Sequence, residues 1–374
     1  MKCIFCGSAN KLVSTNDKSI CKSCIVTSYF LSQVNISEDK DRIKKFKIET
    51  PKYYKSILDE YVIGQDNAKN VLSVAMFNHM TRINNLRSPM LKSNIILRGN
   101  SGQGKTLLVE TLANTLDIPF AIINTSSLTS SGYSGEDVSS IIERLIDKAN
   151  GNIKLAEKGI IFLDEIDKIT SSFGSGKDVS GKAVQQELLK YIEGDKVTIY
   201  LNKTSTYEGD KVLVDTTNIL FIGAGAFPNI NKKVNSISVP NTNSNKTKES
   251  FLTKLELYGF IPEFLGRFSN IVELENLTEK QYKKILLEPK NNIIEKFNNM
   301  LLPHNITLSI EDSIIDEIID RSMNNKIGAR SLQKNLDELF NDFLLNIDLY
   351  LDNSYSVSFD GNIKFRKIKS NIQE

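Results

Sequence analysis

Residues 95–106, which decide the fold, read IILRGNSGQGKT. The apolar run Ile95–Leu97 predicts a short buried strand, and residues 99–106 after it match the pattern G-x4-G-K-T. Apolar residues in the next segment, 107–112, recur at helical spacing. A strand, a glycine loop and a helix in this order predict a phosphate-binding loop, because chance matches to the bare pattern lack that context.

This loop has the chemistry that a nucleotide phosphate chain needs. Glycines let backbone N–H groups turn inward around the phosphates, and the start of the following helix adds partial positive charge. We expect Lys105 to reach the β- and γ-phosphates and Thr106 to place its hydroxyl on Mg²⁺. The candidate nucleotide-binding residues of the loop are Gly99, Gly102, Gly104, Lys105 and Thr106.

A second apolar run, residues 159–165, ends in two acids and reads GIIFLDE. A continuous apolar run suits a strand that is buried on both faces of a parallel sheet. Its end would deliver Asp164 to the metal and Glu165 to the attacking water, so the pair predicts hydrolysis and not binding alone. Asp167 and Lys168, just beyond, are expected to be solvated or helix-capping charges.

Two further apolar strands, at residues 120–123 and 219–222, complete an alternation of strands and helices. Such an alternation predicts an α/β fold with a doubly wound parallel sheet. Upstream of the loop, apolar residues within 68–76 recur at helical spacing, and His79 falls on the same face. We expect His79 to pack in the core and not to bind a ligand.

All four cysteines lie within the first 24 residues, as Cys3-x2-Cys6 and Cys21-x2-Cys24. Two such pairs supply four thiolates that close tetrahedrally around zinc and leave no open position for catalysis. The alternative, a pair of disulfides, belongs to secreted domains, and the first residues do not read as a secretory signal. We predict a structural zinc module. Apolar residues within 29–34 could pack on that module, self-associate or hold a partner.

The C-terminal part, from about Leu274, predicts a small domain of helices with a little sheet, which is called the lid domain below. Helical patterns cover residues 281–287 and 314–319, and alternation on both sides of Asp360-Gly361 predicts a hairpin. We therefore expect a zinc module over 1–34, a linker over 35–55, a large ATPase domain over 56–273 and a small lid domain over 274–374.

Composition excludes several other classes of protein. The chain has 374 residues and a formal net charge of +2, a balance that favours neither nucleic acid nor an anionic membrane as a partner. It has two histidines, which argues against a His-based catalytic triad or a multi-His metal site. No apolar run approaches ~18 residues, so we expect no membrane-spanning helix and a cytoplasmic location.

Several longer motifs point to a family. They read YVIGQ at 61–65, GYSGEDV at 132–138, DEIDK at 164–168, DVSG at 178–181, VQQ at 184–186, IPEFLGR at 261–267 and GAR at 328–330. Together with the phosphate-binding loop and the four-cysteine start, they resemble the ClpX family of AAA+ protein unfoldases. The sibling HslU unfoldases share several of these motifs but lack the zinc module.

The resemblance implies a homohexameric ring that acts on unfolded or tagged proteins, with ATP bound between subunits and with Mg²⁺ and Zn²⁺ as metals. Val62 and Ile63 would then wall the adenine, and Arg330 would be the sensor-2 residue. Arg267 would be the arginine finger inserted into the neighbouring subunit's site. A cation supplied in this way stabilises the charge that develops on the phosphate oxygens.

The resemblance also implies that residues 132–135 form the pore loop that grips the substrate, with Tyr133 as the aromatic side chain. Ser134 departs from the family, which usually has an aliphatic residue at this position. We therefore predict a weaker grip on stable substrates.

Family members that feed the ClpP peptidase carry an Ile/Leu-Gly-Phe docking tripeptide in the segment that corresponds to residues 225–259. This chain has no glycine between Ala226 and Tyr258, and we expect residues 258–260 to be buried. Residues 198–211 and 171–177, which bear on substrate choice in the family, also differ from its pattern. The sequence therefore favours an unfoldase that releases its substrates, although docking by an altered loop stays open.

Two alternatives to a peptidase-linked unfoldase remain at this point. One is a free-standing protein-remodelling chaperone, and the other is an AAA+ motor or loader that acts on nucleic acid. The balanced charge and the aromatic pore loop argue against the second. Stimulation of ATP hydrolysis by unfolded polypeptide or by single-stranded DNA separates the two.

Overall fold

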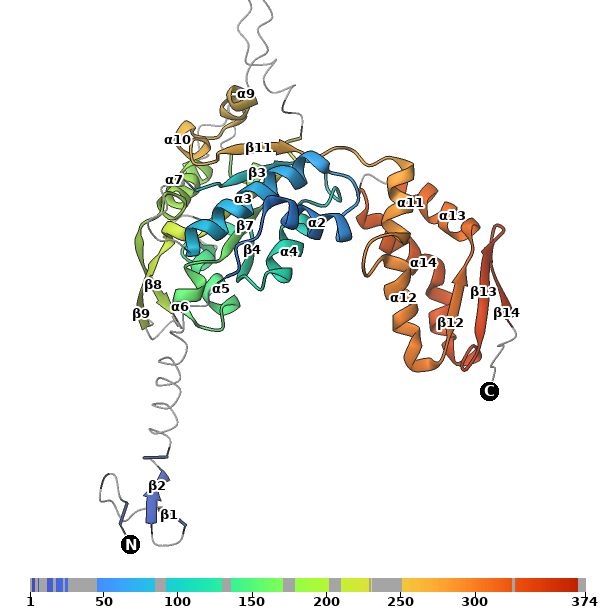
Figure 1. Ribbon diagram of the computed structural model, residues 1–374, viewed down its shortest axis with the longest axis horizontal. Coiled ribbons are helices and arrows are strands. Elements are labelled where there is room, and N and C mark those ends of the chain that lie inside the picture. The colour runs from blue at the N-terminus through green and yellow to red at the C-terminus, as the bar shows by residue number, and fades with distance from the viewer. Residues whose placement is uncertain are drawn as a thin grey trace, which may run out of the picture.

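The computed structural model describes residues 2–3, 6, 12–15, 18–22, 24–25, 46–84, 92–129, 136–170, 179–201, 210–228, 230, 251–324 and 327–368. Most of these residues form two units, which Figure 1 shows side by side. One is a five-stranded sheet with helices on both faces, and the other is a smaller group of helices with a three-stranded sheet.

The central sheet is parallel throughout and has the strand order β11-β3-β10-β7-β4. The predicted α/β fold with a doubly wound parallel sheet is confirmed, and each predicted strand forms within three residues of its expected bounds. Strand β11 was not predicted, because its four residues have no apolar run. The strands are β3 (Ile95–Arg98), β4 (Phe120–Asn124), β7 (Ile160–Asp164), β10 (Leu220–Gly225) and β11 (Asn270–Glu273).

Alternate residues of each strand face opposite cores. Ile95 and Leu97 of β3 belong to one apolar cluster, whereas Ile96 belongs to the other. The first face is covered by α2 (Pro51–Tyr61), α3 (Asp66–Asn84) and α4 (Lys105–Thr115). The second is covered by α5 (Ser140–Lys148), α7 (Val179–Glu193), α9 (Phe251–Tyr258) and α10 (Pro262–Leu265).

The smaller unit, called the lid from here on, has its own apolar core. Its helices are α11 (Glu279–Leu287), α12 (Ile293–Leu301), α13 (Asp312–Met323) and α14 (Arg330–Leu345). The predicted hairpin forms as β13 (Ser354–Phe359) and β14 (Ile363–Ile368), and β12 (Thr307–Ile310) pairs with β13 in parallel. A capping box between Thr278 and Gln281 starts α11 at the point where the chain enters the lid.

Short elements complete the described chain. Near the N-terminus, β1 (Leu12–Thr15) and β2 (Lys18–Cys21) form an antiparallel hairpin. Around the central sheet lie η1 (Thr125–Ser127), β5 (Leu128–Thr129), β6 (Glu136–Asp137), α6 (Ile153–Ala156), η2 (Ile166–Ile169), β8 (Lys196–Leu201), β9 (Asp210–Asp215) and η3 (Thr216–Asn218). The lid also contains η4 (Leu302–His304) and η5 (Ile347–Leu349).

The end of the expected linker is part of the packed structure. Phe46 is buried, and its backbone exchanges two hydrogen bonds with the side-chain amide of Asn84, at 3.2 and 2.8 Å. Helix α2 begins at Pro51, where Thr50 caps it. Residues 46–55, which the sequence assigns to the linker, thus contain the packed Phe46 and the first residues of α2.

Two other expectations concern single elements. His79 is buried and bonds through Nε2 to the carbonyl of Lys158 at 3.0 Å, which confirms it as a packing residue. Residues 258–260 are also buried, as expected, and the side chain of Gln185 bonds to the backbone on both sides of Phe260. Within the described part of the chain, no helix is both long and apolar enough to cross a bilayer.

Candidate functional site

One cavity of about 670 Å³ lies between the carboxyl ends of the central strands and the lid. The sheet side supplies the phosphate-binding loop and the acid pair, since Gly102, Gly104, Lys105, Thr106, Asp164 and Glu165 all line it. The lid supplies Arg330 and residues 289–293. Parallel α/β sheets bind ligands at this edge, because loops and helix N-termini converge there.

The phosphate-binding loop connects β3 directly to α4. Gly104 adopts φ 93° immediately before the first helical residue, Lys105, a conformation that favours glycine. The Lys105 ammonium donates to the carbonyls of Gly99 at 2.6 Å and Asn100 at 2.9 Å. Burial lowers the pKa of Lys105, while the charge of Asp164 acts in the opposite direction. The Lys105 ammonium is thus held by the carbonyls of its own loop, and it would have to leave them to reach a phosphate.

The acid pair stands at the end of β7. Asp164 Oδ1 accepts a hydrogen bond from the N–H of Glu165 at 2.9 Å, and Glu165 has a left-handed backbone with φ 56°. The hydroxyl of Thr125, which follows β4, donates to the carbonyls of Asp164 at 3.0 Å and Glu165 at 2.9 Å. A non-glycine residue with a left-handed backbone, such as Glu165, persists where its surroundings hold it, and such residues cluster at functional sites. Thr125 provides that support here.

Asp167 is buried, whereas the sequence predicted a solvated or helix-capping charge at this position. Its Oδ2 accepts from the N–H of Phe227 at 3.3 Å, and its exposed fraction is 6%. It also lines the cavity beside exposed Lys168. Asp167 lies in η2, which packs against the end of β10 at Gly225. The charge spacing alone did not reveal this burial.

The lid contacts the phosphate-binding loop through backbone. The N–H of Ala329 donates to the carbonyl of Gly102 at 3.1 Å, and Gly328 lies so close that a Cβ there would meet the carbonyl oxygen of Ser101 at 2.5 Å. Arg330 begins α14 immediately after this contact and lines the cavity. The side chain predicted to sense the γ-phosphate is therefore carried by a segment that touches the loop itself.

The structure differs from the prediction that Val62 and Ile63 wall the adenine. Val62 is buried in the apolar core, and the cavity lining includes the preceding Tyr61, with neither Val62 nor Ile63 among its residues. The side chain of Lys69, 4% exposed, donates to the carbonyl of Val62 at 2.6 Å and to Asp59 at 2.8 Å. Buried Lys69, paired with the exposed Asp59, thus fixes the backbone of this segment next to the cavity.

Arg267 lies away from the cavity of its own chain. It follows α10, its carbonyl accepts from the Asn94 side chain at 3.0 Å, and its guanidinium forms an ion pair with Glu193 at the end of α7. The Arg267 side chain is 49% exposed. An arginine that is fixed at the backbone and exposed at its tip can reach a second molecule.

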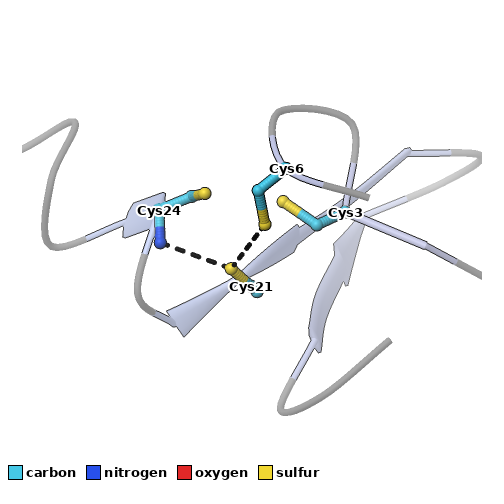
Figure 2. Close-up of side chains that lie close together, drawn as sticks. All are labelled: Cys3, Cys6, Cys21 and Cys24. Carbon is cyan, nitrogen blue, oxygen red and sulfur yellow. Dashed lines mark hydrogen bonds between the residues drawn. The ribbon is translucent and has the colours of Figure 1, made fainter. Parts of the chain in front are cut away.

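The four cysteines converge, and Figure 2 shows their sulfur atoms facing one another across the end of the β1–β2 hairpin. All four sulfurs lie within 4.8 Å of one another. Cys21 is central, since its sulfur lies 3.5 Å from that of Cys6 and 3.4 Å from the N–H of Cys24. Hydrogen bonding with Cys6 and Cys21 raises the pKa of Cys24 to about 12. Four convergent cysteine sulfurs match the tetrahedral donor set of structural zinc sites, so this cluster fits zinc.

Other predicted features lie outside the described residues. These are Tyr133 and Ser134 of the pore loop, the apolar residues 29–34, the segments 171–177 and 202–206, and residues 231–250, where a docking loop would stand.

Sequence reasoning missed a set of side chains that join the lid to the large domain. Gln65, 3% exposed, donates to the carbonyl of Glu275 at 2.9 Å and accepts from its N–H at 2.8 Å. Gln103 donates to Asn276 at 2.7 Å. Gln65 was visible only as part of the YVIGQ motif, and the partners of both glutamines lie more than 170 positions away.

Comparison with known proteins agrees with this geometry. Residues 91–271 match the family model of the AAA domain (Cdc48 subfamily), and residues 277–349 match the C-terminal D2-small domain of ClpB protein. The ATP-dependent Clp protease ATP-binding subunit ClpX of Azotobacter vinelandii is 37% identical, covering 92% of this chain and 86% of that protein.

The subunits of the same name from two other bacteria are equally similar. That of Bacteroides thetaiotaomicron is 38% identical over 96% of this chain and 94% of its own length. ClpX 2 of Wolinella succinogenes is 38% identical over 93% of this chain and 91% of its own length. With this identity over more than nine-tenths of its length, and with its loop, acid pair and lid arginine around one cavity, the chain belongs to the ClpX family of AAA+ ATPases.

Proposed function

We propose that this chain uses ATP hydrolysis to unfold proteins and thread them through the pore of a homohexameric ring. One observation carries the proposal, namely that the phosphate-binding loop, the acid pair and Arg330 of the lid surround one cavity. Membership of the ClpX family supports the same function. The relative from Azotobacter vinelandii is named as the ATP-binding subunit of a Clp protease.

Each residue of the cavity has a role that its chemistry supports. Lys105 exchanges the carbonyls of its own loop for the β- and γ-phosphates of ATP. Thr106 and Asp164 hold Mg²⁺, which when bound neutralises charge on the phosphate oxygens. Glu165 orients the attacking water and accepts its proton, and Arg330 contacts the γ-phosphate from the lid.

Arg267 acts on the ATP of a neighbouring subunit. Its distance from the cavity of its own chain, its exposed tip and its fixed backbone support this role. Hydrolysis then needs an assembled ring, because charge on the transferring phosphoryl group is stabilised only when a second subunit supplies the arginine.

The four cysteines hold one zinc ion in a structural module. The segment that carries them is too short to bury an apolar core of its own, so the metal contributes folding energy. We divide the chain into this module at 1–34, a linker that ends before Phe46, a large ATPase domain up to Glu273 and the lid.

The proposed function is tested with purified protein and a tagged fluorescent substrate. We expect ATP to drive loss of the substrate's fluorescence, and unfolded polypeptide to stimulate ATP hydrolysis. Stimulation only by single-stranded DNA would contradict the proposal and favour a nucleic-acid motor.

The peptidase partner requires a separate measurement. The absence of glycine between Ala226 and Tyr258 supports an unfoldase that releases its substrates intact. Co-elution with a ClpP-type peptidase from the same source, in a slowly hydrolysed ATP analogue, distinguishes the two forms of the proposal. A hexamer that ignores the peptidase supports release, whereas a stable complex supports regulated proteolysis.

A further inference from the structure

The lid is joined to the large domain next to the phosphate-binding loop by contacts that are partly buried, with Gln65 3% exposed. The amide of Gln65 makes a reciprocal pair of hydrogen bonds with the backbone of Glu275, and Ala329 donates to Gly102. Gln65 and the preceding Gly64 both have positive φ, 61° and 67°. A buried amide that lost these partners would be left unsatisfied, so this side of the lid is costly to separate.

A second connection stands at a different part of the cavity and is exposed. The loop between α11 and α12 brings Lys290 against the end of α2. Its N–H donates to the carbonyl of Glu60 at 2.9 Å, its ammonium lies 2.5 Å from the Glu60 carboxylate, and the same ammonium lies 5.9 Å from the Tyr61 ring centroid. Lys290 and Tyr61 both line the cavity, whereas Glu60 does not.

The two connections differ in strength. The side chains of Lys290 and Glu60 are 60% and 48% exposed, and exposed ion pairs change an equilibrium by a factor of roughly 1.4 to 5. The hydrogen bonds of Gln65 are harder to break, because Gln65 is 3% exposed and its amide would lose both of these partners. The Lys290–Glu60 ion pair is therefore the weaker of these interactions.

We propose that the Lys290–Glu60 pair is a latch that holds the lid over bound nucleotide and thereby slows nucleotide release. The proposal rests on the proposed function, since it assigns a positioning role at the same ATP site. Glu60 acts without touching the nucleotide, by holding Lys290, Tyr61 and the loop of residues 288–292 in place. Salt weakens such a latch because both partners are in contact with solvent.

The test is the dissociation rate of a fluorescent N-methylanthraniloyl-ADP, chased with unlabelled ADP, from the full chain. We expect Glu60→Gln and Lys290→Met each to release the probe about 2- to 5-fold faster than the parent. The charge-exchanged variant, Glu60→Lys with Lys290→Glu, should return towards the parent rate. Raising the ionic strength from ~0.1 M to ~1 M should accelerate release from the parent more than release from Glu60→Gln, because only the parent has the ion pair to lose.

Glu338→Gln is the matched control. It removes the Lys334–Glu338 pair, which is 60% and 54% exposed but lies within α14 and does not join the lid to the large domain. We expect it to release the probe at the parent rate.

Two outcomes would overturn the latch and leave the ATPase in place. One is an unchanged release rate in both Glu60→Gln and Lys290→Met. The other is an unchanged rate in Glu60→Gln with acceleration in Lys290→Met, which would mean that Lys290 acts by contacting the nucleotide itself. If the parent chain bound no probe at all, the latch and the proposed function would both be wrong.

Discussion

The role proposed for Arg267 depends directly on a second subunit. We expect Arg267→Ala to bind nucleotide as the parent does, because its side chain lies outside the cavity of its own chain. Its ATP hydrolysis should fall by roughly 10³-fold, as for other arginines that are supplied in trans. Steady-state hydrolysis and nucleotide titration measure the two effects separately.

A mixture of variants provides the control for Arg267. Glu165→Gln lacks the group that activates water but keeps Arg267, so mixed rings with Arg267→Ala contain some intact sites. Partial recovery of hydrolysis on mixing is expected. A mixture that hydrolyses ATP only at the summed rate of the two inactive variants would mean that Arg267 acts within its own subunit or only supports the fold.

A second prediction at the scale of one residue concerns Ser134 and the grip on the substrate. In the proposed pore loop, Ser134→Val restores the aliphatic side chain beside Tyr133 and should improve the grip on stable substrates. We expect faster unfolding across a graded series of substrates, with the largest gain for the most stable ones. No gain on the stable members of the series would show that Ser134 does not limit the grip.

At the scale of elements, the contact between the phosphate-binding loop and the segment before α14 is made by two glycines. Gly328→Ala places a Cβ 2.5 Å from the Ser101 carbonyl oxygen at φ +67°, so the loop and the lid must move apart. We expect weaker ATP binding and a loss of about 2 kcal/mol or more in the free energy of unfolding. A titration with a fluorescent nucleotide and thermal denaturation measure these changes.

Gly361→Ala is the matched control for that contact. Gly361 has φ +72° in the β13–β14 turn, with no atom within 4 Å of an added Cβ. It should cost about 1 kcal/mol from backbone strain alone and leave ATP binding unchanged. Equal effects of the two variants on ATP binding would contradict a specific role for the Gly102–Gly328 contact.

The β1–β2 hairpin is expected to depend on the zinc ion that we propose for the four cysteines. Removal of zinc by a chelator, or Cys21→Ser, should unfold the N-terminal module, because four crowded thiols then lack a cation. The thermal midpoint of the ATPase domain should stay the same. Zinc content and limited proteolysis follow the module, and a hairpin that resists proteolysis after zinc removal would contradict this prediction.

At the scale of the whole molecule, one buried histidine couples stability to pH. Burial lowers the pKa of His79 to about 4, from an ordinary value of 6.5. The unfolded chain therefore binds a proton between these values that the folded chain does not. The free energy of unfolding should fall by about 3 kcal/mol as the pH drops from 6.5 to 4, and this loss is complete below pH 4.

The slope of the unfolding free energy against pH checks this prediction. His79→Leu should lower stability at neutral pH, because the carbonyl of Lys158 loses its partner, but it should flatten the slope between pH 4 and 6.5. The exposed His304 is the other histidine, and His304→Gln should keep the parent slope. An unchanged slope in His79→Leu would assign the pH dependence to other groups.

The sequence by itself determined the chemistry of the ATP site and of the cysteine cluster. Lys105 and Thr106 follow β3 after the short loop of residues 99–104, and Asp164 ends β7 with Glu165 next, because phosphate and metal binding need fixed short spacings. The four strands of the sheet core were predicted for a similar reason, since a run buried on both faces must be apolar.

Only the tertiary structure decided how the lid meets the large domain. Gln65 pairs with Glu275 across 210 positions and Lys290 with Glu60 across 230, and no periodic pattern records such a pair. The burial of Asp167 and the packing of Phe46 against Asn84 depend in the same way on neighbours brought together by folding. Local spacing encodes which groups can do chemistry, whereas the packing of distant elements determines how tightly the lid closes over them.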